Sequence, residues 1–301
     1  RIELVAMVDY SLDGGFQSPR HAVRVIAHLK ANRIRRPDVV LAFGQPLLNK
    51  HSSALSAAEL YNIYEEVYIA ALDLKDVVLA KQCLGVLEKR FPKSKRVQCL
   101  EAMFHEAAGD FTAAGVIYDT LLEDDPANTH VMKRRAAVKA MQGNVTGAVQ
   151  LLVKYVETYS GDAEAWLELA KLYVDEGQYR QAAFCYEEVI VLAPANAVFH
   201  CKYAEVLYTL GTPGDIKAAR KYFAHALNLS PANNARALYG LLMCCQASLP
   251  GGASKSKPAK DKDGSTHAME LMEKASSQLK AIYGAQSTHA RLVDKMLANL
   301  V

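Results

Sequence analysis

The sequence lacks the segments that place a chain in or across a membrane. No apolar run among its 301 residues approaches the roughly 18 needed to span a bilayer, which excludes a direct membrane span. Asp9 interrupts the early apolar stretch, so no signal peptide is visible. The sequence begins at Arg1 rather than Met.

A surplus of one charge sign is also missing. The chain has 35 basic and 32 acidic residues and a formal net charge of +3. Nucleic-acid-binding proteins carry a clustered basic excess, so this balance predicts no nucleic-acid partner.

Motifs for catalysis and for cofactors are absent as well. The sequence contains no Gly-x-Gly-x-x-Gly, Walker, His-Glu-x-x-His or Gly-x-Ser-x-Gly pattern and no Cys-x-x-Cys spacing. His105 and Glu106 are adjacent, but consecutive side chains on a helix point in different directions. We therefore expect a protein that is not an enzyme and uses no cofactor or metal.

Helical apolar patterns are abundant, and residues 166–194 show them most clearly. Gly177 is expected to be a left-handed helix end between two helices, and Pro194 cannot continue the second one. Helices this short are marginal alone, so their apolar faces need neighbours. The first face comprises Trp166, Leu169, Ala170 and Tyr173, and the second comprises Ala182, Tyr186, Val189, Ile190 and Ala193.

The neighbours are copies of the same unit, because small and turn residues recur every 34 positions. The next step after Ala182 is 37 residues, to Ala219, and the three extra residues are expected in the turn Thr212-Pro213-Gly214. A 34-residue period with this order of Trp, small, Tyr, Gly, Ala, aromatic and Pro resembles the tetratricopeptide repeat. The recurring sets are Gly109, Gly143, Gly177 and Gly211; Ala102, Ala136, Ala170 and Ala204; and Ala80, Ala114, Ala148 and Ala182.

This register predicts an all-α tetratricopeptide-repeat superhelical solenoid with capping helices at both ends. Two repeats are degenerate, with Tyr68 at a usual small position and Ser160 where Pro is expected. The predicted parts are an N-terminal helical cap at 1–55, a solenoid at 56–248, a flexible loop at 249–266 and C-terminal capping helices at 267–301. Repeats are expected near 61–94, 95–128, 129–162, 163–196 and 197–233, with a partial repeat from 234.

Short sequence patterns also predict the helices at the two ends of the chain. Ser18-Pro19 predicts a helix start, continued by Val23, Ile26, Ala27 and Ile34 until Pro37. Ser56 with Glu59 predicts a capping box that opens a long helix through Leu74. Apolar residues at helical spacing then predict the C-terminal caps, at Ala268, Leu271, Met272, Ala275, Leu279 and Ile282 and at Leu292, Val293, Met296, Leu297 and Leu300.

The six cysteines follow the repeat rather than a ligand pattern. Cys83 and Cys99 are 16 residues apart, as are Cys185 and Cys201, and the two pairs are three repeat lengths apart. A disulfide or a metal site is conceivable, but buried small side chains at a helix seam are favoured. Cys244-Cys245 lie on different sides of a helix, and a reduced, cytosolic compartment fits this usage.

A solenoid of helix pairs presents a concave groove formed by its first helices. Each charged residue in this groove has an alternative interpretation: it does not bind a partner but lies on a solvated helix face and forms local ion pairs. Capture of a chaperone's terminal carboxylate is disfavoured, because Lys133 is accompanied by Ala137, Glu168 and Val198 where amide and basic residues are needed. The predicted groove residues are Arg96, Met103, Lys133, Arg134, Lys171, Asp175, Lys202, Glu205 and Tyr208.

A closer resemblance covers residues 60–245. Segments such as GDAEAWLELAKLYVDEGQYRQAAFCYEEVI (161–190), IYEEVYIAALDL (63–74) and RKYFAHALNLSPANNARALYGLL (220–242) are similar to the family of subunit 2 of the endoplasmic reticulum membrane protein complex. That resemblance implies a cytosolic subunit, peripheral on the endoplasmic reticulum. It would bridge the cytosolic parts of the third and fifth subunits and dock the eighth or ninth.

The resemblance further implies a scaffold that supports insertion of tail-anchored and multispanning proteins, while the chemistry resides in the membrane subunits. The alternative is a soluble tetratricopeptide adaptor that binds peptide segments of chaperones or other partners. A scaffold should be unstable without its partners, whereas an adaptor should be stable alone.

Overall fold

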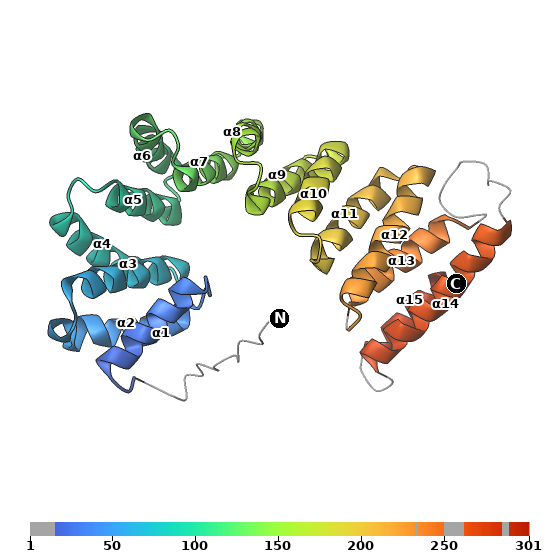
Figure 1. Ribbon diagram of the computed structural model, residues 1–301, viewed down its shortest axis with the longest axis horizontal. Helices are drawn as coiled ribbons and strands as arrows, with labels where there is room; N and C mark the ends of the chain where they lie inside the picture. The colour runs from blue at the N-terminus through green and yellow to red at the C-terminus, as the bar shows by residue number, and fades with distance from the viewer. Residues whose placement is uncertain (1–15, 233, 250–261, 285–288, 301) are drawn as a thin grey trace. The chain divides into compact units, whose positions relative to one another are not determined.

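A computed structural model describes residues 16–232, 234–249, 262–284 and 289–300, and the regular elements in these ranges are all helical (Figure 1). The all-α class predicted from the sequence is therefore confirmed. The α-helices are α1 (Pro19–Ala31), α2 (Pro37–Lys50), α3 (Ala57–Asp73), α4 (Val77–Arg90), α5 (Lys95–Ala108), α6 (Phe111–Asp124), α7 (Thr129–Met141), α8 (Val145–Thr158), α9 (Ala163–Asp175), α10 (Tyr179–Leu192), α11 (Ala197–Leu210), α12 (Pro213–Leu229), α13 (Ala235–Ala247), α14 (Lys262–Tyr283) and α15 (Ala290–Leu300). A 3₁₀ turn, η2 (Ser52–Ala54), precedes α3.

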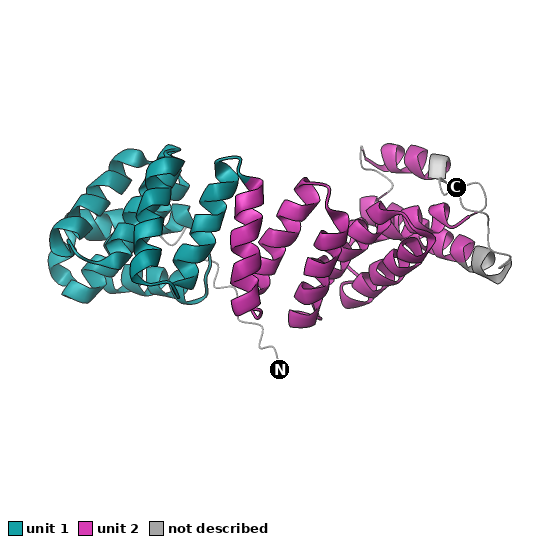
Figure 2. Cartoon of the chain, turned by 90° about the horizontal axis from the view of Figure 1, so that it is seen from above, with its two compact units in different colours: residues 1–144 teal, residues 145–301 magenta. Residues whose placement is uncertain are grey.

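The chain divides into two compact units, residues 1–144 and residues 145–301 (Figure 2). In the first unit each helix from α1 to α7 packs against the next in sequence. The second unit repeats this arrangement from α8 to α15, and α11 and α15 also contact α13. Each unit is thus an array of neighbouring helices, so its buried faces are covered by consecutive elements.

The 34-residue period is reproduced by the helix boundaries. Four first helices begin at Lys95, Thr129, Ala163 and Ala197, and four second helices begin at Phe111, Val145, Tyr179 and Pro213. Side-chain oxygens of Asn128, Asp162 and Asn196 accept from first-turn N–H groups of three of these first helices. These helix starts follow the 34-residue period of the sequence, while the predicted repeat bounds stay a prediction.

The turn inside each repeat requires a left-handed residue. Gly109, Gly143, Gly177 and Gly211 have φ of 80°, 78°, 70° and 74°. At Gly177 the backbone N–H donates to Val174 O at 3.0 Å, which fixes the end of α9 as the sequence predicts. In the first repeat Lys75 takes the same place with φ of 60°, a conformation that costs a side-chain-bearing residue free energy.

The three extra residues of the fifth repeat do not lie in its turn, so that prediction was wrong. Thr212 is the N-cap of α12 and accepts from the Asp215 N–H at 3.2 Å, while Pro213 is the first helical residue. Proline is preorganised for this position because its φ is already helical and it has no N–H to satisfy. The insertion therefore lengthens α12 to 17 residues, against 14 in α10.

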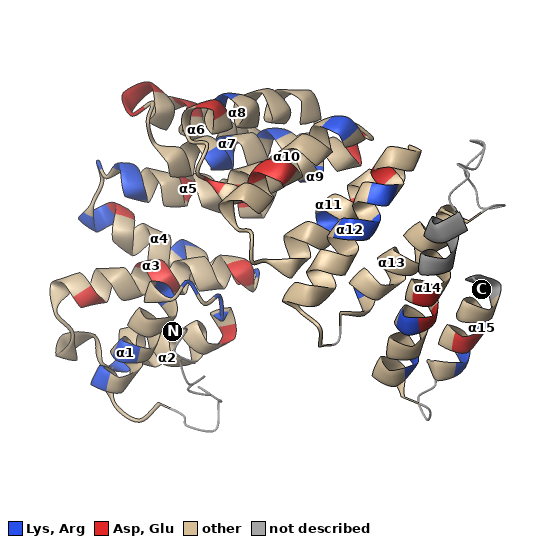
Figure 3. Cartoon of the chain, turned by 45° about the vertical axis from the view of Figure 1, so that its right-hand side comes forward, with Lys and Arg blue, Asp and Glu red and all other residues tan. Residues whose placement is uncertain are grey.

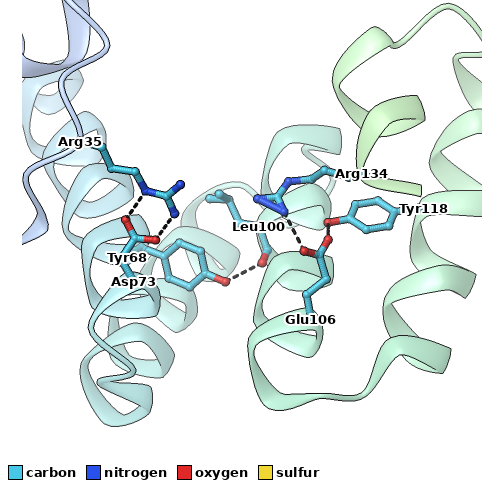
Figure 4. A network of polar contacts seen from close by, with 7 residues as sticks. All are labelled: Arg35, Tyr68, Asp73, Leu100, Glu106, Tyr118 and Arg134. Atoms are coloured by element: carbon cyan, nitrogen blue, oxygen red, sulfur yellow. Dashed lines mark hydrogen bonds and ion pairs between the residues drawn. The ribbon is translucent and has the colours of Figure 1, made fainter. Parts of the chain in front are cut away.

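Alanines at the repeated small positions are all buried, which allows the helices of a repeat to approach closely. The predicted exception, Tyr68, is also fully buried, and its hydroxyl donates to Leu100 O at 2.6 Å (Figure 4). A large side chain is accepted there because its polar end finds an acceptor on α5.

The N-terminal signals are confirmed where the structure describes them. Ser18 Oγ accepts from the His21 N–H at 3.2 Å, and Ser56 and Glu59 form the expected capping box. However, α1 ends at Ala31, so Ile34 lies outside the helix and is exposed. The backbone reverses at Arg33, which has φ of 54°, before α2 begins.

At the C-terminal end, α14 begins at Lys262, so residues 262–266 of the predicted loop are helical, while 250–261 lie outside the described residues. Once the later turns of α14 have formed, adding residues 262–266 to the helix costs only the free energy set by their intrinsic helix propensities. Ala268, Met272, Ala275 and Leu279 are buried as expected, and so are Val293 and Leu297 on α15. Leu292 was expected on the packed face of this cap but is 66% exposed. None of the helices that the structure describes is both long and apolar enough to cross a bilayer.

Candidate partner-binding surface

In the first unit, the predicted groove residues lie on α5 and α7. Arg96 and Met103 come together in the lining of a pocket of about 420 Å³, which α1, α3 and the start of α7 also line. Lys133 and Arg134 belong to α7 but do not line that pocket. The structure therefore brings Arg96 and Met103 together, and partner binding by this set stays a prediction.

The charges around this pocket are largely neutralised within the fold. Arg96 pairs with Glu65 on α3 at 2.6 Å, and Lys30 on α1 pairs with Glu66 at 2.6 Å. Both signs are interspersed over the helices (Figure 3). Burial, together with Arg134 and Lys133, lowers the pKa of His130 below its ordinary value, which favours the neutral ring at neutral pH.

Arg134 forms hydrogen bonds inside the fold rather than presenting its charge in a groove. Its Nη1 donates to Glu106 at 2.7 Å, and Glu106 also accepts from the Tyr118 hydroxyl (Figure 4). Burial and the hydrogen bond to Glu106 both raise the pKa of Tyr118, so the phenol stays protonated and remains a donor. This network joins α5, α6 and α7, and removing one member would leave a buried polar group unpaired.

In the second unit, the predicted residues lie on α9 and α11. Lys171 and Asp175 are exposed and one turn apart on α9. Glu205 on α11 pairs with Arg236 on α13, with an Nη2···Oε2 distance of 2.7 Å. Lys202 and Tyr208 are half-buried, and burial raises the pKa of Tyr208. Ion pairs within the fold thus engage Arg96, Arg134 and Glu205, whereas Lys171 and Asp175 present their side chains to solvent.

The sequence did not indicate a pocket of about 700 Å³ between α8, α9 and α10. Trp166 and Phe184 meet edge to face in its lining, with ring centroids 6.0 Å apart. Phe184 is 55% exposed, whereas Trp166 is nearly buried and its Nε1–H donates to Ser160 O at 2.9 Å. The missed signal was Phe184 itself, an aromatic residue two positions past Ala182 and off the buried stripe of α10.

Further apolar side chains are exposed on both units. They include Val116 and Met141 in the first unit and Val191 and Val198 in the second, each more than half exposed. Single exposed apolar residues are ordinary, but an apolar groove such as the one at Phe184 is typical of an interaction site.

All six cysteines are buried free thiols, as the favoured interpretation of their spacing predicts. Burial raises the pKa of Cys83 to about 11 and of Cys185 and Cys244 to about 12. The thiolate is the reactive form, so these side chains are packing groups rather than nucleophiles at neutral pH. Within the described residues no three His, Cys, Asp or Glu side chains are grouped to hold a metal ion.

The sequence and fold match proteins of known type. A family model described as the EMC2 TPR-like repeat domain matches residues 77–221. ER membrane protein complex subunit 2-A of Xenopus laevis is 40% identical over 251 residues, covering 83% of this chain and 81% of that protein. ER membrane protein complex subunit 2 of Dictyostelium discoideum is 34% identical over 226 residues, covering 71% and 70%.

Among solved structures, the C-terminal part of a TPR repeat-containing protein from Cytophaga hutchinsonii aligns with a TM-score of 0.56 and 15% identity, over 92% of this chain and 99% of that one. That likeness shows the tetratricopeptide fold alone. The sequence similarity extends over most of both chains. The chain therefore belongs to the family of ER membrane protein complex subunit 2.

Proposed function

We propose that this chain is a non-catalytic scaffold subunit of an endoplasmic reticulum membrane protein complex that inserts transmembrane segments. The observation that carries the proposal is the 40% identity to a curated subunit 2 over more than four-fifths of both chains. The chain would act on the cytosolic face of the membrane, held there by its partners. It would bridge the cytosolic parts of the third and fifth subunits and dock the eighth or ninth, in support of tail-anchored and multispanning clients.

The packing within each unit supports a role in fixed geometry. In the first unit the Glu65–Arg96 pair and the Glu106–Tyr118–Arg134 network join helices of successive repeats. In the second unit Arg236 and Glu205 do the same. The partly buried Glu106–Tyr118–Arg134 network holds α5, α6 and α7 in one arrangement, which supports a scaffold role, whereas the exposed Glu65–Arg96 and Glu205–Arg236 pairs add little.

The test is a native purification of the tagged chain from membranes in mild detergent, followed by quantitative mass spectrometry. The expected result is recovery of a fixed set of multispanning membrane proteins near one-to-one with the chain. Recovery from the soluble fraction, alone or with substoichiometric chaperones, would contradict the scaffold role and favour the adaptor alternative.

Two double variants sharpen this experiment at the predicted groove. Lys171→Ala with Asp175→Ala removes two exposed side chains of α9, so a partner that binds this helix should co-purify at a lower ratio while the chain stays folded. Lys217→Ala with Lys221→Ala removes two exposed side chains of α12 and is the control. Equal partner ratios for both variants would exclude α9 from the interface.

A further inference from the structure

A separate pocket of about 430 Å³ lies in the first unit, outside the predicted groove set except for Arg96. The start of α3, the end of α4 and the start of α5 line it. Its volume falls within the roughly 300–1,000 Å³ that ligand sites typically occupy. It is open to solvent through exposed residues of all three helices.

The inner part of this pocket is apolar and its wall is aromatic. Leu87, Val97 and Leu100 line it and are buried, so they form a floor rather than a rim. Tyr61 and Phe91 stand edge to face with ring centroids 5.1 Å apart. Phe91 is 39% exposed although it follows directly on α4, so the pocket presents an aromatic surface that the fold does not cover.

The rim carries one cation without an internal counter-charge. Arg90 Cζ lies 5.9 Å from the Tyr61 ring centroid and 5.8 Å from that of Phe91. Arg96 is paired with Glu65, so these two lining charges cancel. No carboxylate in the described part of the chain pairs with Arg90. The aromatic rings hold the guanidinium in place while leaving its edge N–H groups able to bind an anion.

We propose that this pocket binds a short peptide segment of a partner protein in which a bulky apolar side chain adjoins a carboxylate. The apolar side chain would enter between the aromatic wall and the leucine floor, and the carboxylate would accept hydrogen bonds from Arg90. Lys89 and Lys93 are exposed nearby but do not line the pocket, so Arg90 is the one unpaired cation in the described lining and matches one acidic side chain. The aromatic wall and the buried apolar floor beside it favour a peptide side chain over a nucleic acid or a lipid surface, which many cations bind together. The inference rests on the proposed function only for where such a partner is found, since the pocket chemistry is independent of it.

The experiment measures fluorescence anisotropy of short labelled peptides titrated with the full 301-residue chain. The four peptides share a Gly/Ser frame and carry Phe-Glu, Phe-Gln, Phe-Lys or Ala-Glu at their centre. We expect saturable binding of the Phe-Glu peptide, weakened about tenfold by Arg90→Glu because attraction becomes repulsion. The other three peptides should bind the wild-type chain more weakly than Phe-Glu does.

Lys89→Glu is the matched control. It makes the same charge change at the neighbouring exposed position of α4 and does not line the pocket, so affinity should be retained. Ala58→Trp is an independent variant that fills the pocket from an exposed position and should abolish binding. Circular dichroism melts of all three variants would establish that they remain folded.

Three outcomes would overturn the proposal. They are equal loss of affinity in Arg90→Glu and Lys89→Glu, no preference for Phe-Glu over Phe-Lys, and no saturable binding at millimolar protein. Sedimentation velocity adds a fourth, a dimer that dissociates only in Arg90→Glu, which would assign the pocket to a second copy of the chain. Because peptide binding is measured on the isolated chain and co-purification on membranes, either result can fail without the other.

Discussion

At the scale of single residues, the buried thiols define how the native chain should react. At pH 8, Cys83, Cys185 and Cys244 have raised pKa values of about 11, 12 and 12, so their thiolate fractions are very small. We expect iodoacetamide to modify the native protein far more slowly than the guanidinium-unfolded protein, in which all six cysteines react. Peptide mass spectrometry after timed quenching measures this, and native labelling at the unfolded rate would show that the thiols are accessible.

Two glycines on helices should respond in opposite ways to alanine. An added Cβ at Gly240 would lie 2.2 Å from Cζ of buried Phe223, whereas one at Gly85 meets nothing within 4 Å. Overpacking costs about 1–3 kcal/mol, and Gly→Ala in a helix gains about 1 kcal/mol. Urea unfolding should therefore show lower stability for Gly240→Ala and higher stability for Gly85→Ala. A gain in both variants would mean that Phe223 moves aside freely.

The sequence predicted most buried residues but not how their polar atoms are satisfied. Trp166 Nε1 and His200 Nε2 each donate to a carbonyl six residues earlier, at Ser160 and Pro194. The second donor and acceptor lie 34 residues after the first, at equivalent positions of the next repeat. A carbonyl accepts only, so His200 carries its proton on Nε2, and Nδ1 is buried without a partner in the described structure. The 34-residue spacing predicted where these residues lie in the repeat. The direction of their side chains depends on how the helices pack in three dimensions.

At the scale of helices, the close crossing of α9 and α10 depends on small residues. Ala182 is fully buried, and Ala170 on α9 is equally buried. We expect Ala182→Leu to hold the two helices apart and to lower stability by about 1–3 kcal/mol. A thermal melt with an unchanged midpoint would contradict this, and Ala137→Leu, at an exposed position of α7, is the control.

The left-handed turn positions give a second prediction at this scale. Lys75 holds φ of 60° where later repeats have glycine, and that conformation costs about 1–2 kcal/mol for a residue with a Cβ. Lys75→Gly should raise stability by about 0.5 kcal/mol, since glycine's larger unfolded-state entropy offsets part of the relief. Gly177→Ala should lower it by about 1 kcal/mol, from backbone strain alone, because its added Cβ meets no neighbour. Chemical denaturation measures both, and a loss of stability with Lys75→Gly would show that the lysine side chain contributes more than its strain costs.

Helix boundaries could be predicted from the sequence where the capping interactions join residues that are close in sequence. The Ser56–Glu59 box and the four glycine turns involve residues close in sequence, so their patterns identified them. The insertion at Thr212 was misplaced because a turn and the first turn of a helix share the same residue types. Only the hydrogen bond from Asp215 N–H to Thr212 Oγ1 distinguishes them.

At the scale of the whole molecule, the end of the second unit depends on its last helices. Leu238, Leu242 and Cys245 of α13 are fully or nearly buried, and α14 packs against this helix. A chain that ends after Ser248 should expose an apolar face and self-associate, since terminal repeats need a polar outer surface. Light scattering after size-exclusion chromatography measures this. Ending instead at residue 284 removes only α15 and should leave a monomer; monomers in both cases would show that α14 is not a required cap.

The candidate binding surface was less predictable than the fold. Register placed the nine groove residues on first helices, but ion pairs to Glu65, Glu106 and Arg236 depend on which helices become neighbours and at what angle. The pockets beside Phe184 and Arg90 arise where second helices meet the next repeat, and no local pattern marks them. Whether partners contact the nine residues stays a prediction for the variants above.

Trp166 is the chain's single tryptophan, and the fold places it in the pocket beside Phe184 in the second unit. Excitation of intrinsic emission at long ultraviolet wavelength therefore reports on one location without any added dye. Its spectrum should shift when a partner covers Phe184 or when α9 and α10 separate, and it should be insensitive to a ligand at Arg90 in the first unit. The protein thus carries a built-in optical reporter of events in its second unit.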